Sequence, residues 1–419
     1  MARLTVTGGR PLSGSVRISG SKNASVAMIP AALLASGVSV LENVPEIVDV
    51  DVFGRILSQL GARVSREEGR GLVIDPNGFK TWEAPYELVK KLRASYYLLG
   101  VLLARFGRAE VALPGGCNIG LRPIDQHIKG FRALGAEVVL EHGVVKAWTK
   151  GKGLKGAPVY LDVVSVGATI NIMLAAVLAD GLTVIENAAK EPHVVNLANY
   201  LNSMGAKVQG AGTDVIRIKG VKRLTGSQHP VIPDEVEAAT FMVAAAATGG
   251  DVLVTNVIPK HLDSVSAKLR EAGVEVIENG DSVRVVGPGR PRAVNVKTLP
   301  YPGFPTDCQQ VFAALMARAD GISMIQETIY DNRFGYANEL IRMGASIKVD
   351  GRTAIIEGVD RLFGAPVTAI DLRAGAAMVV AGLSAQGKTD VYGVDHIERG
   401  YERLVDKLVG LGAEVSLVK

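Results

Sequence analysis

Two kinds of helical pattern alternate along the 419 residues of this chain. Segments of the first kind are rich in alanine and apolar on every side, as in "GATINIMLAAVLADG" and "EAATFMVAAAATGG". Segments of the second kind, such as "GYERLVDKLVGLG", have one charged face. A helix that is apolar all round belongs in an interior, whereas an amphipathic helix keeps one face in water. Runs of β-branched residues such as "LTVIENA" predict strands, so we expect a mixed α/β structure with buried helices.

The same order of elements recurs six times along the chain. A short tag that contains glycine, such as "LGAEV", ends each amphipathic helix and begins a strand. The tags lie about 70 residues apart, at Gly61, Gly135, Gly205, Gly273, Gly344 and Gly412. Solenoid repeats are shorter than about 50 residues. We therefore expect two pseudo-symmetric halves, each made of three repeats in the order strand, buried helix, strand, amphipathic helix and one or two further strands.

The best candidate for a hinge is the polar stretch "GSQHPVIPDEVE" at residues 226–237, between the third and fourth repeats. Composition adds few constraints. Hydrophobic residues make up 48% of the chain and charged residues 21%, which is typical of a packed globular protein. Two cysteines cannot form a disulfide framework, so we expect a reducing, cytoplasmic setting.

Several classes of protein are disfavoured by the sequence. We expect no signal peptide, because no apolar run stands near the first residues, and the apolar stretch 167–179 is too short to span a bilayer. No His/Cys cluster has the spacing of metal ligands. The formal net charge of +4 comes without a basic run, so it favours a small anionic ligand as readily as nucleic acid.

Polar residues that the repeats do not share are candidates for function. Many of them are predicted at or near the starts of helices: Lys22, Asn23, Arg93, Arg122, Asp307, Arg333, Arg373 and Arg399. Helix starts attract anions, and arginine holds phosphate or carboxylate in a bidentate manner. Any single arginine there can equally be a solvated surface residue. Asp307 can equally be a helix N-cap, and Cys308 beside it a small core residue.

A thiol stands in the glycine-rich stretch "LPGGCNIGLRP", residues 113–123. Cys117 is close to Arg122 and to a predicted helix start, which would lower its pKa and make it reactive. The alternative is a loop cysteine without a chemical role. The stretch is not a phosphate-binding loop, because it has neither a Gly-Lys-Ser/Thr ending nor a G-x-G-x-x-G pattern.

Motifs along the whole chain resemble those of one enzyme family. The segments "SGSKNA", "LRAS", "LPGGCNIGLRPIDQH", "SVGAT", "FPTD", "NRF", "DLRA" and "HIERGYER" are similar, in this order, to those of the UDP-N-acetylglucosamine 1-carboxyvinyltransferases, also called enolpyruvyl transferases. The resemblance implies an EPSP synthase-like, inside-out α/β barrel with a site in the cleft between two domains. It implies residues 22–229 as the domain with the Cys loop, and residues 1–21 with 230–419 as the other.

The resemblance also implies a reaction. The enolpyruvyl group of phosphoenolpyruvate passes to the 3-hydroxyl of UDP-N-acetylglucosamine through a tetrahedral intermediate, and phosphate leaves. This is the first committed step of peptidoglycan precursor synthesis. No cofactor or metal is implied, the partners are these two small molecules, and no nucleic acid or membrane is involved. The oligomeric state stays open, a monomer included.

Residue roles follow from the resemblance as well. Asp307 matches the general base, and Cys117 matches the acid that protonates the methylene carbon of phosphoenolpyruvate and is alkylated by the epoxide fosfomycin. Residues matched to the binding of phosphoenolpyruvate and its surroundings are Lys22, Asn23, Arg93, Arg122, Arg333, Arg373 and Arg399. Of these, Lys22 and Arg399 also count as catalytic, together with Cys117 and Asp307. Residues matched to the uridine nucleotide are Arg122, Pro123, Ile124, Asp125, Gln126, Val163, Val164, Ser165, Val166 and Ile329.

This chain departs from the family pattern at two places. Some relatives carry a lysine just before the "SVGAT" segment, where Asp162-Val163-Val164 stands here, and a histidine is usual where Tyr336 stands. We assign Tyr336 no role. Two other hypotheses remain: an enolpyruvyl transferase that acts on shikimate 3-phosphate, which the Cys loop disfavours, and a non-catalytic repeat scaffold or RNA-end-processing protein.

Overall fold

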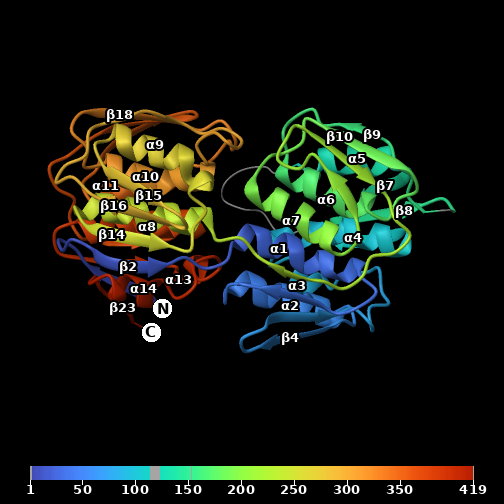
Figure 1. Ribbon diagram of the computed structural model, residues 1–419. Coiled ribbons are helices and arrows are strands. Elements are labelled where there is room, and N and C mark those ends of the chain that lie inside the picture. Colours follow the sequence, from blue (N-terminus) through green and yellow to red (C-terminus); the bar gives the residue numbers. More distant parts are fainter. Residues whose placement is uncertain (1, 114–122, 152, 419) are drawn as a thin grey trace. The chain divides into compact units, whose positions relative to one another are not determined.

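The computed structural model describes residues 2–113, 123–151 and 153–418, and these divide into two compact units (Figure 1). We call residues 2–19 and 233–418 the Asp307 unit, and the described residues of 20–232 the Lys22 unit. Each unit has its own hydrophobic core. Each contains three repeats of the predicted order.

The Lys22 unit begins with helix α1. Its first repeat comprises α1 (Lys22–Ala31), the 3-10 helix η1 (Ala32–Leu34), β3 (Ser39–Glu42), α2 (Val48–Gln59), β4 (Arg63–Glu67) and β5 (Gly71–Asp75). The second comprises α3 (Tyr86–Val89), η2 (Arg93–Tyr96), α4 (Tyr97–Phe106), β6 (Arg108–Ala112), α5 (Asp125–Ala133), β7 (Ala136–Glu141) and β8 (Val144–Thr149). The third comprises β9 (Pro158–Tyr160), α6 (Val166–Ala176), β10 (Leu182–Glu186), α7 (Pro192–Ser203), β11 (Lys207–Gln209) and β12 (Val215–Lys219), followed by β13 (Gln228–Pro230).

The Asp307 unit opens with β1 (Arg3–Thr7) and β2 (Ser13–Arg17) and resumes at α8 (Glu235–Thr248). The fourth repeat continues with β14 (Asp251–Thr255), η3 (Pro259–Leu262), α9 (Asp263–Glu271), β15 (Glu275–Asn279) and β16 (Ser282–Val286). The fifth comprises β17 (Val296–Lys297), η4 (Thr306–Cys308), α10 (Gln309–Met316), β18 (Ile322–Gln326), α11 (Ala337–Arg342), β19 (Ser346–Asp350) and β20 (Thr353–Glu357). The sixth comprises β21 (Pro366–Thr368), α12 (Leu372–Ser384), β22 (Lys388–Tyr392), α13 (Val394–Ile397), α14 (Leu404–Gly410) and β23 (Glu414–Val418).

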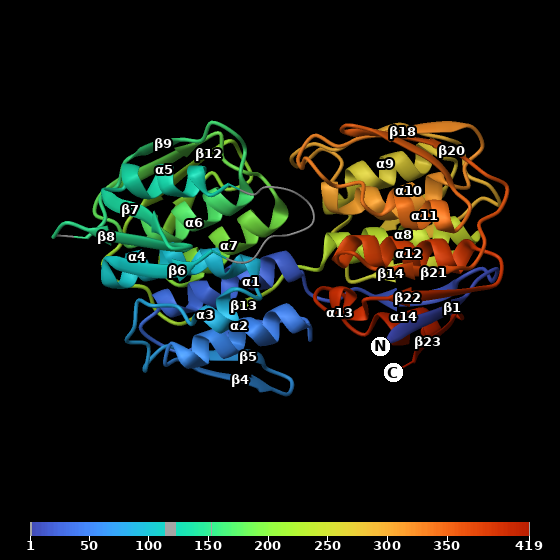
Figure 2. The same ribbon diagram turned by 180° about the vertical axis from the view of Figure 1, so that it is seen from behind.

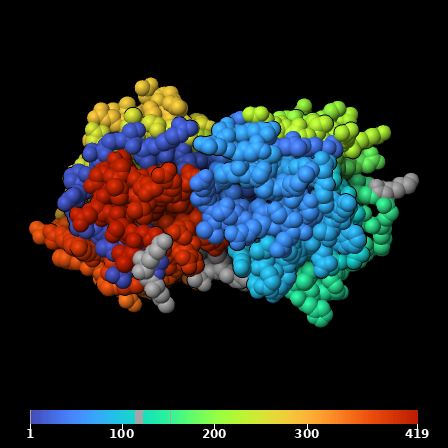
Figure 3. All heavy atoms as spheres, turned by 90° about the horizontal axis from the view of Figure 1, so that it is seen from below, coloured from blue at the N-terminus to red at the C-terminus, as the bar shows by residue number. Residues whose placement is uncertain are grey.

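The first strands of two repeats are exchanged between the units. β2, which precedes α1 in the sequence, pairs in parallel with β14, whereas β13, which precedes α8, pairs in parallel with β3. β1 completes the last sheet, where it lies antiparallel between β22 and β23 (Figure 2). The two ends of the chain therefore lie on one face of the Asp307 unit, where dark blue N-terminal residues border red C-terminal ones (Figure 3). Hydrophobic periodicity alone cannot predict which strands pair.

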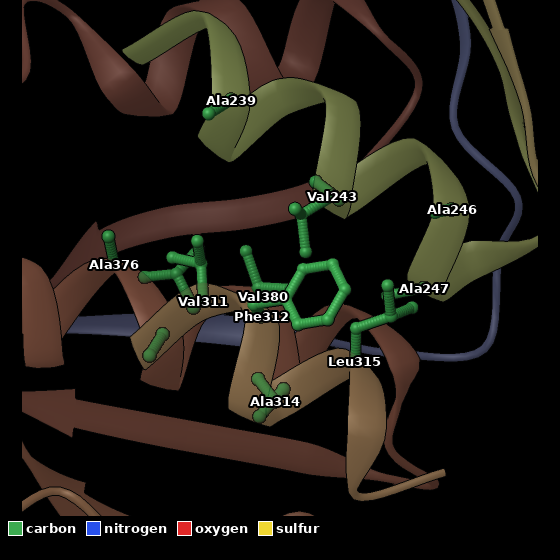
Figure 4. Packing of buried hydrophobic residues seen from close by; sticks show 14 of the residues in the cluster. Ala239, Val243, Ala246, Ala247, Val311, Phe312, Ala314, Leu315, Ala376 and Val380 are labelled. Atoms are coloured by element: carbon green, nitrogen blue, oxygen red, sulfur yellow. The ribbon is translucent and has the colours of Figure 1, made fainter. Parts of the chain in front are cut away.

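The alanine-rich helices form the interior, as predicted. In the Asp307 unit α8, α10 and α12 pack against one another, and Figure 4 shows the ring of Phe312 among Val243, Leu315 and Val380. The sheets lie outside these helices, which is the inside-out arrangement (Figure 1). Small side chains let helices approach closely: a Cβ at Gly100 of α4 would lie 2.3 Å from the main-chain oxygen of Asn171 in α6. Helix α7 departs from the expectation for the second kind of helix, because most of its residues are buried.

A buried ion pair holds the N-terminal segment in the Asp307 unit. Glu237 of α8 is 2% exposed, and its Oε1 accepts a hydrogen bond from Lys407 Nζ. Its Oε2 accepts the main-chain N–H of Ser19 at 2.8 Å, and Lys407 also donates to the Ser19 hydroxyl at 2.6 Å. The main-chain N–H of Asp234 donates to the Ser19 carbonyl at 2.9 Å. The chain passes from one unit to the other between residues 19 and 20 and again between residues 232 and 233. Hydrogen bonds of this cluster fix the chain next to both places.

The cluster predicts a pH-dependent stability. Burial raises the pKa of Glu237 to about 7, although Lys407 opposes the shift, whereas an unfolded glutamate titrates near pH 4.3. Between these values the folded chain holds a proton that the unfolded chain has released. The free energy of unfolding should therefore fall as pH rises to about 7, by at most about 1.4 kcal/mol per pH unit. Urea unfolding of the wild type and Glu237→Gln across this range should show a weaker pH dependence in the variant.

The matched control for this experiment is Glu275→Gln, at an exposed position of β15. It should follow the wild-type pH dependence. If Glu237→Gln also kept the full wild-type dependence, the titrating group would be another residue.

Candidate active site

The carboxylate of Asp307 lies between two buried guanidinium groups. Its Oδ1 accepts a hydrogen bond from Arg333 Nη2 at 2.7 Å, and its Oδ2 accepts one from Arg373 Nε at 3.1 Å. The side chains of the two arginines are 3% and 4% exposed, whereas that of Asp307 is 28% exposed. The acid is thus the accessible member of the cluster.

Three local structures bring these side chains together. Asp307 lies in η4, directly before α10, and Arg373 is the second residue of α12. Asp371 caps α12: its Oδ1 accepts from the main-chain N–H groups of Arg373 at 2.8 Å and Ala374 at 2.9 Å. Arg333 lies in the loop before α11. Asp307 and Arg373 come from different repeats, and the packing of α10 against α12 brings their charges into contact.

The two arginines stay charged in spite of burial. Burial disfavours the charge of Arg333, but Asp307, Tyr330 and Asp371 outweigh it and raise the pKa of the guanidinium. Burial likewise opposes the charge of Arg373, and Asp307 and Tyr401 raise its pKa. The Cζ atom of Arg333 lies 5.0 Å from the ring centre of Tyr330, and that of Arg373 lies 5.6 Å from the ring centre of Tyr401.

Each of the two arginines also has one guanidinium nitrogen whose hydrogen bonds are not satisfied within the described part of the chain. Among the described residues, Nη1 of Arg333 and Nη1 of Arg373 have no hydrogen-bond partner, although both atoms are buried. A buried donor without a hydrogen-bond partner is costly.

Tyr336, to which the sequence analysis assigned no role, is linked to the main chain of Arg333 through Gln309. Its hydroxyl donates to Gln309 Oε1 at 2.7 Å, and Gln309 Nε2 donates to the main-chain carbonyl of Arg333 at 3.5 Å. Both side chains are buried. Cys308 is 1% exposed, and burial raises the pKa of its thiol far above the usual range, so it is the core residue that one interpretation predicted.

Two other predicted residues of the Asp307 unit are partly accessible. Arg399 lies in the turn after α13, between that helix and α14. Ile329 lies in the loop after β18, and its side chain is 37% exposed. An exposed isoleucine in a loop is a suitable contact for an apolar ligand surface.

The Lys22 unit carries the second set of predicted residues. Lys22 is the first residue of α1, and its Nζ lies 2.9 Å from Oδ2 of Asp49, whose side chain is 4% exposed. Asn23 follows it, and Arg93 begins η2; both are partly exposed. The sequence analysis missed Asp49, although an acid in the first turn of α2 was a visible signal for a cation partner.

The two segments predicted to bind the nucleotide lie side by side. Gln126 Oε1 accepts the main-chain N–H of Asp162 at 2.9 Å, and Gln126 Nε2 donates to the carboxylates of Asp125 at 2.7 Å and Asp162 at 3.2 Å. Lys129 Nζ donates to Asp162 Oδ1 at 2.6 Å. The structure therefore joins residues 123–126 to residues 162–166, a link that the sequence analysis did not predict.

These joined segments combine apolar and polar features. Pro123, Val163 and Val164 are exposed, which provides an apolar surface. Ser165 caps α6 by accepting the main-chain N–H of Ala168 at 3.3 Å, and Val166 is the first residue of that helix. A helix start next to an apolar surface suits a ligand that has both a ring and a phosphate.

A neutral histidine fixes the helix behind this surface. Burial lowers the pKa of His127 to about 4, so the ring is neutral at physiological pH. Its Nδ1 lies 3.0 Å from Nδ2 of Asn171, which also donates to the Tyr96 carbonyl at 2.7 Å. Asn171 thus joins α5 and α6, next to the segments predicted to bind the nucleotide, to the start of α4.

Some predictions fall outside what the structure describes. Cys117 and Arg122 belong to residues 114–122, which lie outside the described residues. Among the residues that the structure covers, no cluster of histidine, cysteine, aspartate or glutamate is suited to a metal ion. Within the same part of the chain, no helix has the length and apolar character needed to cross a membrane.

The fold is that of a known class of proteins. The sequence model of EPSP synthase (3-phosphoshikimate 1-carboxyvinyltransferase) matches residues 6–408. The solved enolpyruvyl transferase NikO from Streptomyces tendae superimposes with a TM-score of 0.89 at 26% identity, covering 100% of this chain and 99% of that chain. An EPSP synthase from Acinetobacter baumannii gives a TM-score of 0.76 at 19% identity, which shows the shared fold alone.

Curated relatives narrow the class. A protein of Symbiobacterium thermophilum named UDP-N-acetylglucosamine 1-carboxyvinyltransferase 3 is 57% identical over 418 residues, covering 100% of this chain and 98% of its own. A protein of Clostridium botulinum named UDP-N-acetylglucosamine 1-carboxyvinyltransferase is 57% identical over 416 residues, covering 99% of both chains. The chain therefore belongs to the EPSP synthase family and, within it, to the UDP-N-acetylglucosamine 1-carboxyvinyltransferases. The resemblance that the motifs indicated and the inside-out α/β fold are confirmed.

Proposed function

We propose that this chain transfers the enolpyruvyl group of phosphoenolpyruvate to the 3-hydroxyl of UDP-N-acetylglucosamine and releases phosphate. The observation that carries the proposal is the 57% identity over the whole chain to proteins named for this activity. The product is a precursor of peptidoglycan. We further propose that the reaction takes place in the cytoplasm, without a nucleic acid or membrane partner.

Asp307 is suited to remove the proton of the attacking hydroxyl. Its Oδ1 accepts a hydrogen bond from Arg333 and its Oδ2 accepts one from Arg373. Because 28% of the side chain is exposed, a substrate hydroxyl can approach the carboxylate. Arg333 and Arg373 fix the orientation of the carboxylate, and a positioned base of this kind contributes about a hundredfold to ten-thousandfold.

The addition and the elimination can be balanced with groups of this chain. The sugar oxygen bonds to C2 of phosphoenolpyruvate as its proton passes to Asp307, and C3 receives a proton from the Cys117 thiol. In the elimination the Cys117 thiolate takes a proton back from C3, the C2–O bond to phosphate breaks, and the enol ether forms. The leaving phosphate takes up the proton that Asp307 had accepted. Lys22, Arg93, Arg122 and Arg399 are proposed to hold the phosphate and carboxylate, since cations stabilise charge that develops in the transition state.

We propose that the nucleotide binds to the joined segments 123–126 and 163–166, with Ile329 as a further contact. The exposed Pro123, Val163 and Val164 support an apolar contact with the base, and the start of α6 supports a contact with phosphate. We also propose that residues 22–229 and residues 1–21 with 230–419 act as the domains that carry Cys117 and Asp307.

Phosphate release tests this function directly. The purified chain is given phosphoenolpyruvate with UDP-N-acetylglucosamine, with shikimate 3-phosphate, or with no acceptor. We expect steady release with the sugar nucleotide only. Release only with the shikimate compound would replace the proposed acceptor, and release with neither would favour the non-catalytic scaffold.

A further inference from the structure

An asparagine follows the central strand of three repeats. Asn43, Asn187 and Asn256 come directly after β3, β10 and β14, in the left-handed region at φ 55°, 57° and 56°. Each side-chain amide donates to the carbonyl of the residue that follows the parallel neighbour strand. These bonds reach Val231 at 2.9 Å, Leu161 at 2.9 Å and Ile18 at 2.6 Å, respectively. The asparagine is therefore a structural feature of the repeat.

The fifth repeat has a glutamate at this position. Glu327 follows β18, as "SMIQET" replaces "TVIENA" and "VLVTNV". Glu327 does not take the left-handed conformation, which asparagine tolerates better than glutamate. The residue that follows the parallel strand is here Thr298, and the contact is reversed: the Thr298 hydroxyl donates to Glu327 Oε1 at 2.9 Å.

The buried carboxylate of Glu327 collects donors from three segments. Its Oε1 accepts the main-chain N–H groups of Ile329 at 2.8 Å and Tyr330 at 3.2 Å, in addition to the Thr298 hydroxyl. Its Oε2 accepts the Thr306 hydroxyl at 2.8 Å. Glu327 is 1% exposed, so these donors rather than water satisfy its carboxylate oxygens. A carboxylate has about four acceptor sites, whereas an asparagine amide presents a shorter side chain and only one oxygen.

The donors are the neighbours of the proposed reaction centre. Thr306 precedes Asp307 in η4, and Ile329 is the predicted nucleotide contact. Tyr330 carries the ring that lies 5.0 Å from the Arg333 guanidinium. The Glu327 carboxylate therefore connects Thr306, which is next to the proposed general base Asp307, with the loop that contains Ile329 and Tyr330.

We propose that Glu327 is a positioning residue that sets the register between the Asp307 segment and the 329–330 loop. This proposal rests on the proposed function, which assigns Asp307 as the general base and Ile329 as a contact of the nucleotide. In three other repeats the residue at this position only fixes the strand end, whereas in the fifth repeat it connects two segments of the proposed active site.

The first test restores the residue of the other repeats. Glu327→Asn should fold, because three repeats hold asparagine at this position, but it should lose the bonds to Thr306 and to the loop. We expect kcat/KM to fall about ten- to a hundredfold, since small misplacements of reacting groups have effects of this size. The matched control is Glu357→Asn, at an exposed position of β20, which should keep wild-type kinetics. A folded Glu327→Asn with wild-type kinetics would overturn the proposal.

The second test separates the two arms of the connection without changing Glu327. Thr306→Val removes the hydroxyl at nearly constant volume, and Thr306→Ser keeps it. We expect Thr306→Val to lower kcat with little change in KM for the nucleotide, and Thr306→Ser to restore kcat. Equal kinetics in the two variants would contradict the role of the Thr306–Glu327 bond, and this comparison decides even if Glu327→Asn fails to fold.

A third measurement does not depend on the reaction. Amide hydrogen exchange should become faster at residues 328–333 in Glu327→Asn and remain unchanged in Glu357→Asn. If the wild type released no phosphate with UDP-N-acetylglucosamine, the proposed function would fail while the connection could still be detected by exchange. Unchanged exchange in Glu327→Asn would overturn the connection itself.

Discussion

Asp307→Asn should lower kcat by about a hundredfold to ten-thousandfold, because the amide cannot accept the proton of the sugar hydroxyl. The change keeps the size of the side chain and one oxygen that can accept a hydrogen bond. KM for either substrate should change much less than kcat, since the residues that hold the substrates stay in place. Steady-state release of phosphate with both substrates varied measures the two effects separately.

The same substitution should also reduce stability. Arg333 and Arg373 are buried and share the Asp307 carboxylate, and neutralising it leaves two buried cations without their counter-ion. Removing one partner of a buried ion pair costs about 3–5 kcal/mol, and the partial exposure of Asp307 places this case at the lower end. Urea unfolding should show the loss, and kinetics are therefore measured where the variant is folded.

Asp307→Glu is the control that keeps the charge. It should recover most of the stability but only part of the turnover, because the longer side chain moves the carboxylate from its place between the arginines. A folded Asp307→Asn with wild-type kcat would show that another group accepts the proton.

Cys117→Ala should abolish most turnover, because the methylene carbon of phosphoenolpyruvate loses its proton donor. A positioned general acid contributes about a hundredfold to ten-thousandfold, and we expect a loss in this range. Cys117→Asp should keep activity, since a carboxylic acid can also donate a proton. Cys117 lies outside the described residues, so this prediction rests on the motif and on the family.

The epoxide fosfomycin gives a second readout at the same position. Attack by the Cys117 sulfur opens the epoxide, forms a thioether and leaves a hydroxyl after protonation. Peptide mass mapping should find the adduct on Cys117 and none on Cys308, whose buried thiol has a strongly raised pKa. Cys308→Ala should therefore keep full sensitivity, whereas Cys117→Asp should be resistant. An adduct on Cys308, or an alkylated Cys117→Asp, would place the reactive thiol elsewhere.

Much of the fold could be predicted because its signals are local. An alanine-rich helix such as α8 is apolar on all sides over a few turns, and a glycine tag marks each return to a strand. The exchange of β2 and β13 has no such signal, because the two strands pair with partners far away in the sequence. The first strand of the second repeat is also reduced to a single bridge between Glu83 and Glu110, which periodicity does not reveal.

The residues of the candidate site could also be predicted in part from the sequence. The residue types and their places near helix starts are visible in the sequence as departures from the repeat. Glu327 is visible in the same way when the strand segments "SMIQET", "TVIENA" and "VLVTNV" are compared letter by letter. The residues that these side chains contact could not be predicted from the sequence. Asp49 beside Lys22, Asp162 beside Gln126 and Tyr336 behind Gln309 are contacts between segments that are separate in the sequence.

The sequence by itself determined the class of fold, the number of repeats and the family, because hydrophobic periodicity and short motifs are properties of neighbouring residues. Only the tertiary structure decided which charges meet. Asp307 and Arg373 come into contact because α10 and α12 pack together. Glu327 has its four donors because the segments that follow β17 and β18 and the 3-10 helix η4 converge. Contacts of this kind depend on the close packing of distant segments, and no local pattern in the chain specifies them.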